Sequence, residues 1–198
     1  KDFITANNKW LLNKHLEEIG LPFPKSQMIN KEQRFDINSI RYPIILKPIE
    51  SFGGGRDIYV FKEKKSFVEF TKSENFNTTY ILQDYVEGYD IDCSVLCKNG
   101  KILACTIQKP YLPGHSEFAP QLAMEFIKDD NLIRVATKLM QTLNWSGVAH
   151  IDLRYDKQSK EYKVIEINPR FWGSLEGSLY AGVNFPYLYA LASLNYNF

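Results

Sequence analysis

The sequence has no long hydrophobic run and no excess of charge of either sign. No apolar stretch approaches the roughly 20 residues that a membrane-spanning helix requires. The 24 Lys and Arg residues nearly balance the 23 Asp and Glu residues, which leaves a formal net charge of +1. A protein with so little net positive charge has weak electrostatic affinity for nucleic acid or for an anionic membrane. We therefore expect neither of these as a partner.

Cysteine is also scarce, and its number is odd. The sequence contains Cys93, Cys97 and Cys105 and no other cysteine. A zinc site built on them would need a fourth ligand, which the spacing does not supply. Three buried thiols in a reducing compartment are the expected state. We therefore expect a cytoplasmic protein.

Several short motifs of catalysis and nucleotide binding are absent. The sequence has no His-Glu-x-x-His zinc motif and no Gly-x-Ser-x-Gly nucleophile elbow. It also lacks the Walker A loop and the Gly-x-Gly-x-x-Gly loop, the two commonest phosphate-binding patterns. Zinc peptidases, elbow-type serine hydrolases and P-loop nucleotidases are therefore not predicted.

What the sequence does contain is a regular succession of apolar patterns. Helices are expected at 5–19 (capped by Thr5 or Asn7 and ended by Gly20), from the charged run at 62–65 to about 72, at 131–143 and at 184–194. Strands are expected at 25–29, 42–48, 58–62, 79–84, 91–97, 102–109, 146–155 and 161–167, with an irregular loop at 111–121. Asn99-Gly100 is a strong signal for a two-residue hairpin. Hairpins mixed with helices predict an α+β fold and not a doubly wound parallel sheet.

The last predicted strand carries two oxygen ligands. Glu166 and Asn168 are two positions apart, so both side chains point to one face of that strand. Asp152 lies on the preceding strand of the same predicted hairpin and can face them. These oxygens, with the guanidinium of Arg170 just beyond Pro169, suit one or two magnesium ions and a polyphosphate. For these residues alone, a solvated edge strand with an Asn-Pro turn is the alternative.

A lysine and a glycine run form a second candidate for phosphate binding. Lys47 ends an apolar strand, and Gly53, Gly54 and Gly55 follow in the next loop. Glycines let backbone amides approach a phosphate closely, and the lysine adds a point charge beside them. Taken alone, this loop more often indicates a flexible hairpin tip, and Lys9 an ordinary solvated charge on its helix.

The segment 83–88, Gln-Asp-Tyr-Val-Glu-Gly, follows another apolar strand. Its backbone groups could form a hinge that pairs with the edge of a purine base. Asp84 or Asp90 could then hold ribose hydroxyls, with Asp92 as a weaker candidate. A strand that ends in a polar turn is the alternative.

Together, these segments resemble the ATP-grasp family, and most of all the branch that contains the large chain of carbamoyl-phosphate synthase. The resemblance covers nearly the whole chain and rests on motifs that occur in the family's order. They are Asn8-Lys9, 42–48 with 51–55, 83–88, 147–152 and 166–170. The sequence departs from the family at Asp84, where glutamate is usual.

The resemblance implies a site for ATP and for Mg²⁺ or Mn²⁺. The metal ligands that it implies are Asp152, Glu166 and Asn168. The catalytic residues that it implies are Arg170 and Lys47. The nucleotide-binding residues that it implies are Lys9, Lys47, Gly53, Gly54, Gly55, Gln83, Asp84, Tyr85, Val86 and Asp90.

The resemblance also implies an ATP-grasp fold of two lobes, whose antiparallel sheets and flanking helices clasp the nucleotide. Residues 1–24 would be a leading helix and linker. Residues 25–86 would be the small lobe with the glycine loop, and 87–198 the large lobe with the magnesium site. Family members carry an N-terminal α/β domain of roughly 100 residues. We expect such a domain to precede this chain in the complete protein.

The activity that the resemblance implies is ATP-dependent ligation of a carboxylate to an amine or a thiol through an acyl phosphate. Small-molecule carboxylates and amines are then the expected substrates. Two alternatives use the same nucleotide site. One is a kinase-like phosphotransferase, and the other is a nucleotide-binding module without catalysis.

Overall fold

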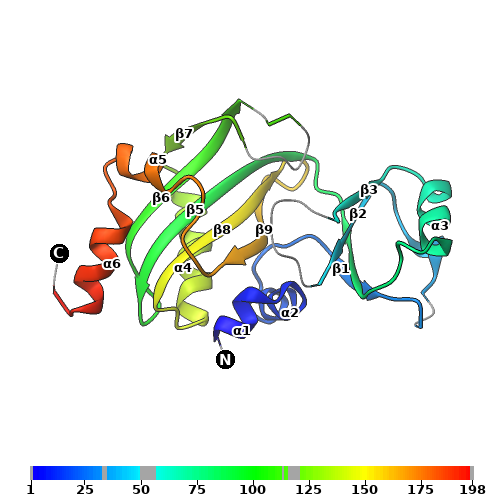
Figure 1. The fold of residues 1–198 in the computed structure, drawn as a ribbon, viewed down its shortest axis with the longest axis horizontal. Helices are drawn as coiled ribbons and strands as arrows, with labels where there is room; N and C mark the ends of the chain where they lie inside the picture. Colours follow the sequence, from blue (N-terminus) through cyan, green and yellow to red (C-terminus); the bar gives the residue numbers. More distant parts are fainter. Residues whose placement is uncertain (1, 33–34, 50–56, 113, 116–120, 197–198) are drawn as a thin grey trace.

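The protein folds around two separate antiparallel sheets with helices on their faces (Figure 1). The computed structural model describes residues 2–32, 35–49, 57–112, 114–115 and 121–196. Its helices are α1 Asp2–Asn7, α2 Lys9–Ile19, α3 Lys64–Lys72, α4 Asp130–Thr142, α5 Leu175–Tyr180 and α6 Phe185–Ser193, with the 3₁₀ turn η1 Ile37–Ser39. Its strands are β1 Ser26–Ile29, β2 Ile44–Pro48, β3 Tyr59–Phe61, β4 Tyr80–Asp84, β5 Gly88–Lys98, β6 Lys101–Leu112, β7 Ala123–Ile127, β8 Gly147–Asp156 and β9 Glu161–Asn168. The α+β prediction is confirmed.

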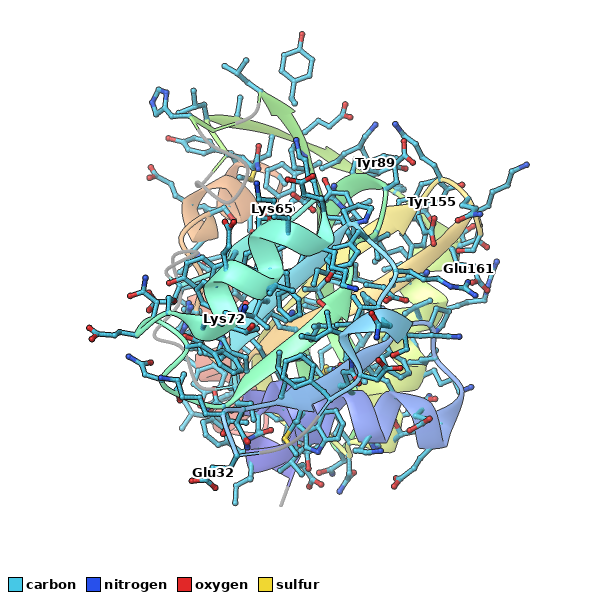
Figure 2. All side chains as sticks on the ribbon, turned by 90° about the vertical axis from the view of Figure 1, so that its right-hand side faces the viewer. Glu32, Lys65, Lys72, Tyr89, Tyr155 and Glu161 are labelled. Atoms are coloured by element: carbon cyan, nitrogen blue, oxygen red, sulfur yellow. The ribbon has the colours of Figure 1, made fainter. Side chains whose placement is uncertain are left out.

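The smaller sheet has the strand order β1-β4-β2-β3 and is covered by α3. Its core is built largely from aromatic rings. Phe67 of α3 is fully buried, and its ring centroid lies 5.3 Å from that of Phe61 and 6.0 Å from that of Phe35. Large rings fill the space under a single short helix that smaller side chains would leave open. The outer surface of α3 carries Lys65 and Lys72 (Figure 2).

The larger sheet has the strand order β7-β6-β5-β8-β9 and is covered on one face by α2 and α4. Along β8, Ala149, Ile151 and Leu153 are buried against these helices. Because side chains alternate along a strand, His150 and Asp152 point to the opposite face. α5 and α6 cover one end of that face, and the rest of it is free to form a site.

A β-bulge in β9 decides which side chains reach that open face. Asp152 of β8 pairs with Glu166, but the next residue, Leu153, pairs with Val164, so Ile165 is an extra residue in the ladder. The bulge lets Val164 and Ile167 both be buried in the core while Glu166 stays on the open face. Bulges often redirect side chains in this way beside functional sites.

The N-terminal helix differs from its prediction. A single helix at 5–19, capped by Thr5 or Asn7, is wrong, because the chain breaks at Asn8 into α1 and α2. The side chain of Asn8 accepts hydrogen bonds of 3.0 Å from the backbone N–H groups of Trp10 and Leu11. Asparagine favours this capping arrangement over a helix interior. The prediction that Gly20 ends the helix is confirmed, with a left-handed φ of 64°.

Three short elements were not predicted from the sequence, namely η1, β7 and α5. The expected irregular loop at 111–121 is wrong at its start, because Tyr111 and Leu112 continue β6, which pairs with β7. The ladder between them is irregular near Pro110, which removes a backbone donor. Residues 113 and 116–120 of that loop lie outside the described residues. The hairpin at Asn99-Gly100 is confirmed, with positive φ at both positions.

Of the three thiols that were expected to be buried, two are. Cys93 and Cys97 are buried and Cys105 is half-buried, and all three are free thiols. None of the helices in the described part of the chain is long and apolar enough to cross a membrane. The chain passes from the small sheet to the large one through residues 85–87. The lobe boundary drawn at residues 86 and 87 stays a prediction.

Gly88, where β5 begins, lies unusually close to the neighbouring strand, and this generates a prediction. A Cβ atom on residue 88 would lie 1.7 Å from the carbonyl oxygen of Tyr155, a backbone atom that cannot move aside. Gly88→Ala should therefore force β5 away from β8 and lower the free energy of unfolding by at least about 2 kcal/mol in chemical denaturation. Gly173→Ala is the control, because its Cβ would meet nothing within 4 Å. Equal stability of the two variants would contradict this reading of the contact.

Candidate active site

A cavity of about 740 Å³ lies between the two sheets and is lined by residues from both. The small sheet contributes Lys47 of β2, and the large sheet contributes Asp92 of β5, Asp152 of β8 and Glu166 of β9. The predicted site residues that line this cavity are Lys47, Gln83, Asp84, Tyr85, Val86, Asp90, Asp152, Glu166, Asn168 and Arg170. Residues far apart in the sequence therefore meet in one place. Gly53, Gly54 and Gly55 lie outside the described residues.

The three proposed metal ligands converge on one face of the β8–β9 hairpin. Asp152 and Glu166 are directly opposite each other in the ladder. The amide nitrogen of Asn168 donates to Oδ2 of Asp152 at 3.1 Å and to Oε1 of Glu166 at 3.3 Å. Three side chains that share such contacts are close enough to bind one cation. The amide of Asn168 would have to turn over to present its oxygen as a ligand.

The electrostatics of this face favour a bound cation. Burial raises the pKa of Asp152 well above its usual range, and the charges of Glu166 and Asp92 raise it further. Burial also raises the pKa of Asp92 to about 7, again with help from neighbouring carboxylates, Asp90 and Glu166. A divalent cation would relieve this crowding of like charges. The donors are oxygens, which Mg²⁺ and Mn²⁺ prefer, so the residues fit such an ion.

Two lysines approach the same carboxylates from other elements. Nζ of Lys9, on α2, lies 3.4 Å from Oε2 of Glu166. Lys47 is 4% exposed, and burial lowers its pKa to about 8 although the charge of Glu166 acts to raise it. Burial alone would raise the pKa of Glu166, but Lys9 and Lys47 hold it below its usual value. Positive charge is therefore concentrated where a polyphosphate would lie beside the cation.

Arg170 follows β9 at the edge of the cavity. Its Nη2 donates to Oδ1 of Asn168 at 3.1 Å, and its Nη1 donates to the backbone carbonyl of Phe171 at 3.0 Å. The guanidinium is exposed, and Arg170 lines the cavity. It can therefore meet an anionic group in the cavity without a large rearrangement.

The predicted hinge, residues 83–88, forms another wall of the cavity. Gln83 is buried and its amide nitrogen donates to Oγ of Ser26 at 3.0 Å, whereas Asp84 is exposed. The backbone N–H of Tyr85 donates to the carbonyl of Pro43. The hinge is thus joined to the small sheet at its start. Its pairing with a purine base stays a prediction.

Arg154 of β8 joins the other end of the hinge to the large sheet. Its Nε donates to the carbonyl of Val86 at 2.7 Å, and its Nη1 pairs with Oδ1 of Asp90 at 2.5 Å. Its Nη2 lies 3.3 Å from the carbonyl of Gly88, and the guanidinium lies over the ring of Tyr85 at 5.5 Å. Arg154 therefore fixes the position of the predicted base-binding segment relative to Asp90, the predicted ribose ligand.

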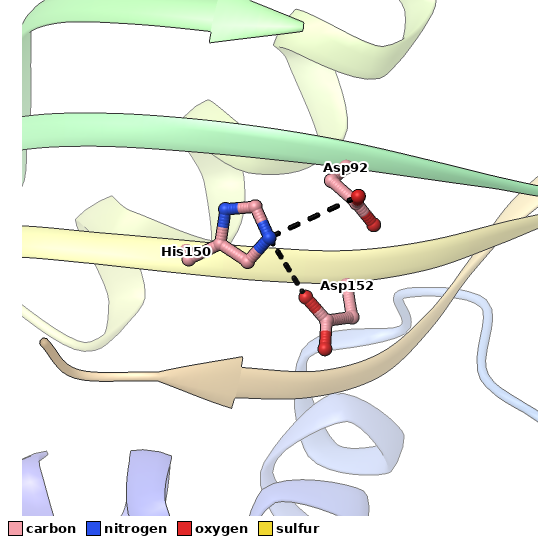
Figure 3. Close-up of side chains that lie close together, drawn as sticks. All are labelled: Asp92, His150 and Asp152. Atoms are coloured by element: carbon pink, nitrogen blue, oxygen red, sulfur yellow. Dashed lines mark ion pairs between the residues drawn. The ribbon is translucent and has the colours of Figure 1, made fainter. Parts of the chain in front are cut away.

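Asp92 and His150 extend the acidic face beyond the predicted ligands (Figure 3). Nε2 of His150 lies 3.3 Å from Oδ1 of Asp152 and 3.8 Å from Oδ2 of Asp92. Burial, together with the charge of Arg170, lowers the pKa of His150 to about 4, so the imidazole is neutral near pH 7. These three residues, with ligand atoms all within 4.8 Å of one another, could also hold a metal.

The sequence pointed to some of these residues only weakly. His150 and Arg154 alternate with Asp152 along β8 and therefore lie on its face, but their residue types alone indicate no particular role. Asp92 pairs directly with Asp152 across the strands. In the sequence, Asp90 and Asp92 are two positions apart and so lie on one face of β5. Only the pairing of β5 with β8 shows that this is also the face of Asp152.

Comparison with known proteins identifies the class. The model of the family described as "ATP-grasp domain" matches residues 6–174. A crystal structure of L-amino acid ligase from Bacillus licheniformis has the same fold, with a TM-score of 0.74, 18% sequence identity, and coverage of 98% of this chain and 49% of that chain. The fold is therefore an ATP-grasp fold, and the chain belongs to the ATP-grasp family.

Curated relatives agree with this assignment. The chain is 24% identical over 171 residues to a D-alanine–D-alanine ligase from Anaplasma marginale (strain Florida), covering 80% of this chain and 50% of the relative. It is 26% identical over 163 residues to a carbamoyl-phosphate synthase from Methanobrevibacter smithii, covering 77% of this chain and 42% of the relative. The predicted resemblance to carbamoyl-phosphate synthase is thus confirmed, and it is shared with amino-acid ligases. The chain spans half or less of the length of these two relatives.

The contacts of Arg154 generate a prediction that does not depend on activity. Arg154→Leu removes the donors to Val86, Gly88 and Asp90 and retains an apolar stem. Since a hydrogen bond from a charged group contributes about 1.5–3 kcal/mol, amide hydrogen exchange of residues 86–89 should become at least about 10-fold faster. Arg134→Leu, on the exposed surface of α4, is the control and should leave the hinge unchanged. Unaltered exchange in both variants would show that Arg154 does not anchor the hinge.

Proposed function

We propose that the complete protein is an ATP-dependent ligase that joins a carboxylate to an amine, or to a thiol, through an acyl phosphate. The observation that carries this proposal is the meeting of Asp152, Glu166 and Asn168 opposite Lys47 in one cavity of an ATP-grasp domain. The ligase relatives support it as well. A carbon–nitrogen bond is the product that we expect.

In the first step, an oxygen of the substrate carboxylate attacks the γ-phosphorus of ATP, and the bond from that phosphorus to the β–γ bridging oxygen breaks. ADP leaves and the acyl phosphate remains. In the second step, the amine nitrogen attacks the acyl carbon and inorganic phosphate leaves, while the amine loses a proton. Lys9 and Lys47 would offset charge on the phosphates, and Arg170 would pair with the transferring phosphoryl group.

Asp152, Glu166 and Asn168 are the residues that would hold Mg²⁺ or Mn²⁺. When bound, the cation would supply neutralisation of charge across the β and γ oxygens of ATP. The base of ATP would lie along the hinge at Gln83 to Val86, with Asp90 near the ribose. Gly53, Gly54 and Gly55 are proposed to approach the phosphates and exclude water that would hydrolyse the acyl phosphate.

The partners that we propose are ATP, a small-molecule carboxylate, a small-molecule amine and a further domain of the same protein. The half-length match to the relatives supports such a domain. The small and large lobes are proposed to meet at residues 86 and 87. A cytoplasmic location is also proposed, and the three free thiols are consistent with it.

Product analysis tests the proposed reaction class. The full-length protein would be incubated with ATP, Mg²⁺ and a panel of carboxylates with and without amines, and the products would be followed by mass spectrometry. ADP together with an amide or thioester is the expected result. ADP with a stable phosphoester would instead identify a kinase-like enzyme, and nucleotide binding without turnover would identify a binding module.

Two substitutions test the site residues. Glu166→Gln removes a carboxylate, and Arg170→Ala removes the guanidinium, so each should reduce ATP turnover by the full-length protein at least ~100-fold, the scale of a single electrostatic group. Glu161→Gln is the matched control, because Glu161 is exposed at the opposite end of β9 (Figure 2). Near-normal ADP release by either site variant would count against the assignment.

A further inference from the structure

A chain of hydrogen bonds connects the start of α5 to the proposed metal site. Oγ of Ser174 donates to Oε1 of Gln108, and Nε2 of Gln108 donates to Oγ of Ser94 at 2.8 Å. Oγ of Ser94 lies 2.9 Å from Nδ1 of His150, whose Nε2 lies 3.3 Å from Oδ1 of Asp152. The hydrogen-bond chain therefore ends at an imidazole that lies beside a carboxylate proposed to bind the cation.

The buried part of this chain fixes the direction of its bonds. Ser94 is 0% exposed and Gln108 is 1% exposed, so their polar groups must find partners within the protein. Because Ser94 accepts a hydrogen bond from Gln108, its own hydroxyl proton is available to donate to Nδ1 of His150. A neutral imidazole that accepts at Nδ1 carries its proton on Nε2.

The other end of the imidazole selects the same tautomer. Nε2 faces the carboxylate oxygens of Asp152 and Asp92 at 3.3 and 3.8 Å. An N–H group in that position is attracted to the carboxylates, whereas a lone pair would be repelled by them. The ring of Trp172 stacks on His150 with an interplanar angle of 16°, which holds the imidazole in this plane. The hydroxyl of Ser94 at Nδ1 and the carboxylates at Nε2 therefore favour the same tautomer.

We propose that His150 is a positioning residue. As an Nε2–H donor beside Asp152, it holds that carboxylate in the orientation in which it binds the divalent cation, and it is not itself a ligand. A metal-binding histidine must offer an unprotonated nitrogen, which the hydrogen-bond chain places at Nδ1, away from the carboxylates. The positioning role rests on the proposed function, but the assignment of the tautomer does not.

Nitrogen NMR tests the tautomer directly. The full-length protein would be labelled with ¹⁵N on histidine, and the signal that disappears in His150→Gln would be assigned to His150. At pH 7.5 we expect a protonated Nε2 and an unprotonated Nδ1, both without metal and with Mg²⁺ present. A proton on Nδ1, or loss of the Nε2 proton when Mg²⁺ is added, would overturn the inference whatever the activity of the protein.

Cation binding tests the positioning role. Mn²⁺ affinity would be measured by calorimetry in the presence of a non-hydrolysable ATP analogue. His150→Leu should weaken Mn²⁺ binding about 10–100-fold, the usual effect of losing a group that orients a metal ligand. His150→Gln can still present an amide N–H to Asp152 and should weaken it much less. His115→Gln, at an exposed histidine, is the control.

The outcomes separate this inference from the proposed function. Unchanged Mn²⁺ affinity in His150→Leu would overturn the positioning role while leaving the ligase proposal in place. Equal losses in the leucine and glutamine variants would also overturn it, because the glutamine retains a donor. Absence of Mn²⁺ binding by the unsubstituted protein would overturn the positioning role and the proposed function together, whereas the NMR result would still report the tautomer.

Discussion

The crowding of carboxylates on one face of the large sheet is the constraint on which the rest of the site depends. Asp92, Asp152 and Glu166 lie on three adjacent strands, and the charge of Glu166 raises the pKa of both aspartates. Such a face is stable only if cations or donors surround it. Lys9 and Lys47 provide positive charge from two directions. Asn168 donates hydrogen bonds from within the same sheet, and Nε2 of His150 lies 3.3 Å from Asp152.

The positive charges around this acidic face come from elements that lie far apart in the sequence. α2 precedes the whole small sheet, but Leu12 and Leu16 of this helix are buried in the core of the large sheet. That packing brings Lys9, at the start of the helix, to Glu166 near the end of β9. The charge of Lys47, on the small sheet, acts on Glu166 as well. The two sheets are therefore linked electrostatically across the cavity as well as through residues 85–87.

The elements with strong local signals could be predicted from the sequence. Asn99-Gly100 specified its hairpin, and the alternation of Glu166 and Asn168 placed both on one face. The elements and roles that could not be predicted have physical causes. Asn8 competes for backbone donors inside an otherwise helical pattern, and β7 and α5 are too short to show a clear period. Arg154 could not be given a role because its partners, Val86 and Asp90, are defined only by the pairing of β5 with β8.

The bulge at Ile165 has a consequence for how such chains are compared. It offsets β9 by one residue relative to β8, so a regular alternation of inward and outward side chains cannot be continued through this strand. A related chain without the extra residue could keep the letters Glu-x-Asn and still direct them into its hydrophobic interior. When sequences are aligned here, the residue count between Tyr162 and Glu166 is therefore as informative as the identity of the acidic residue.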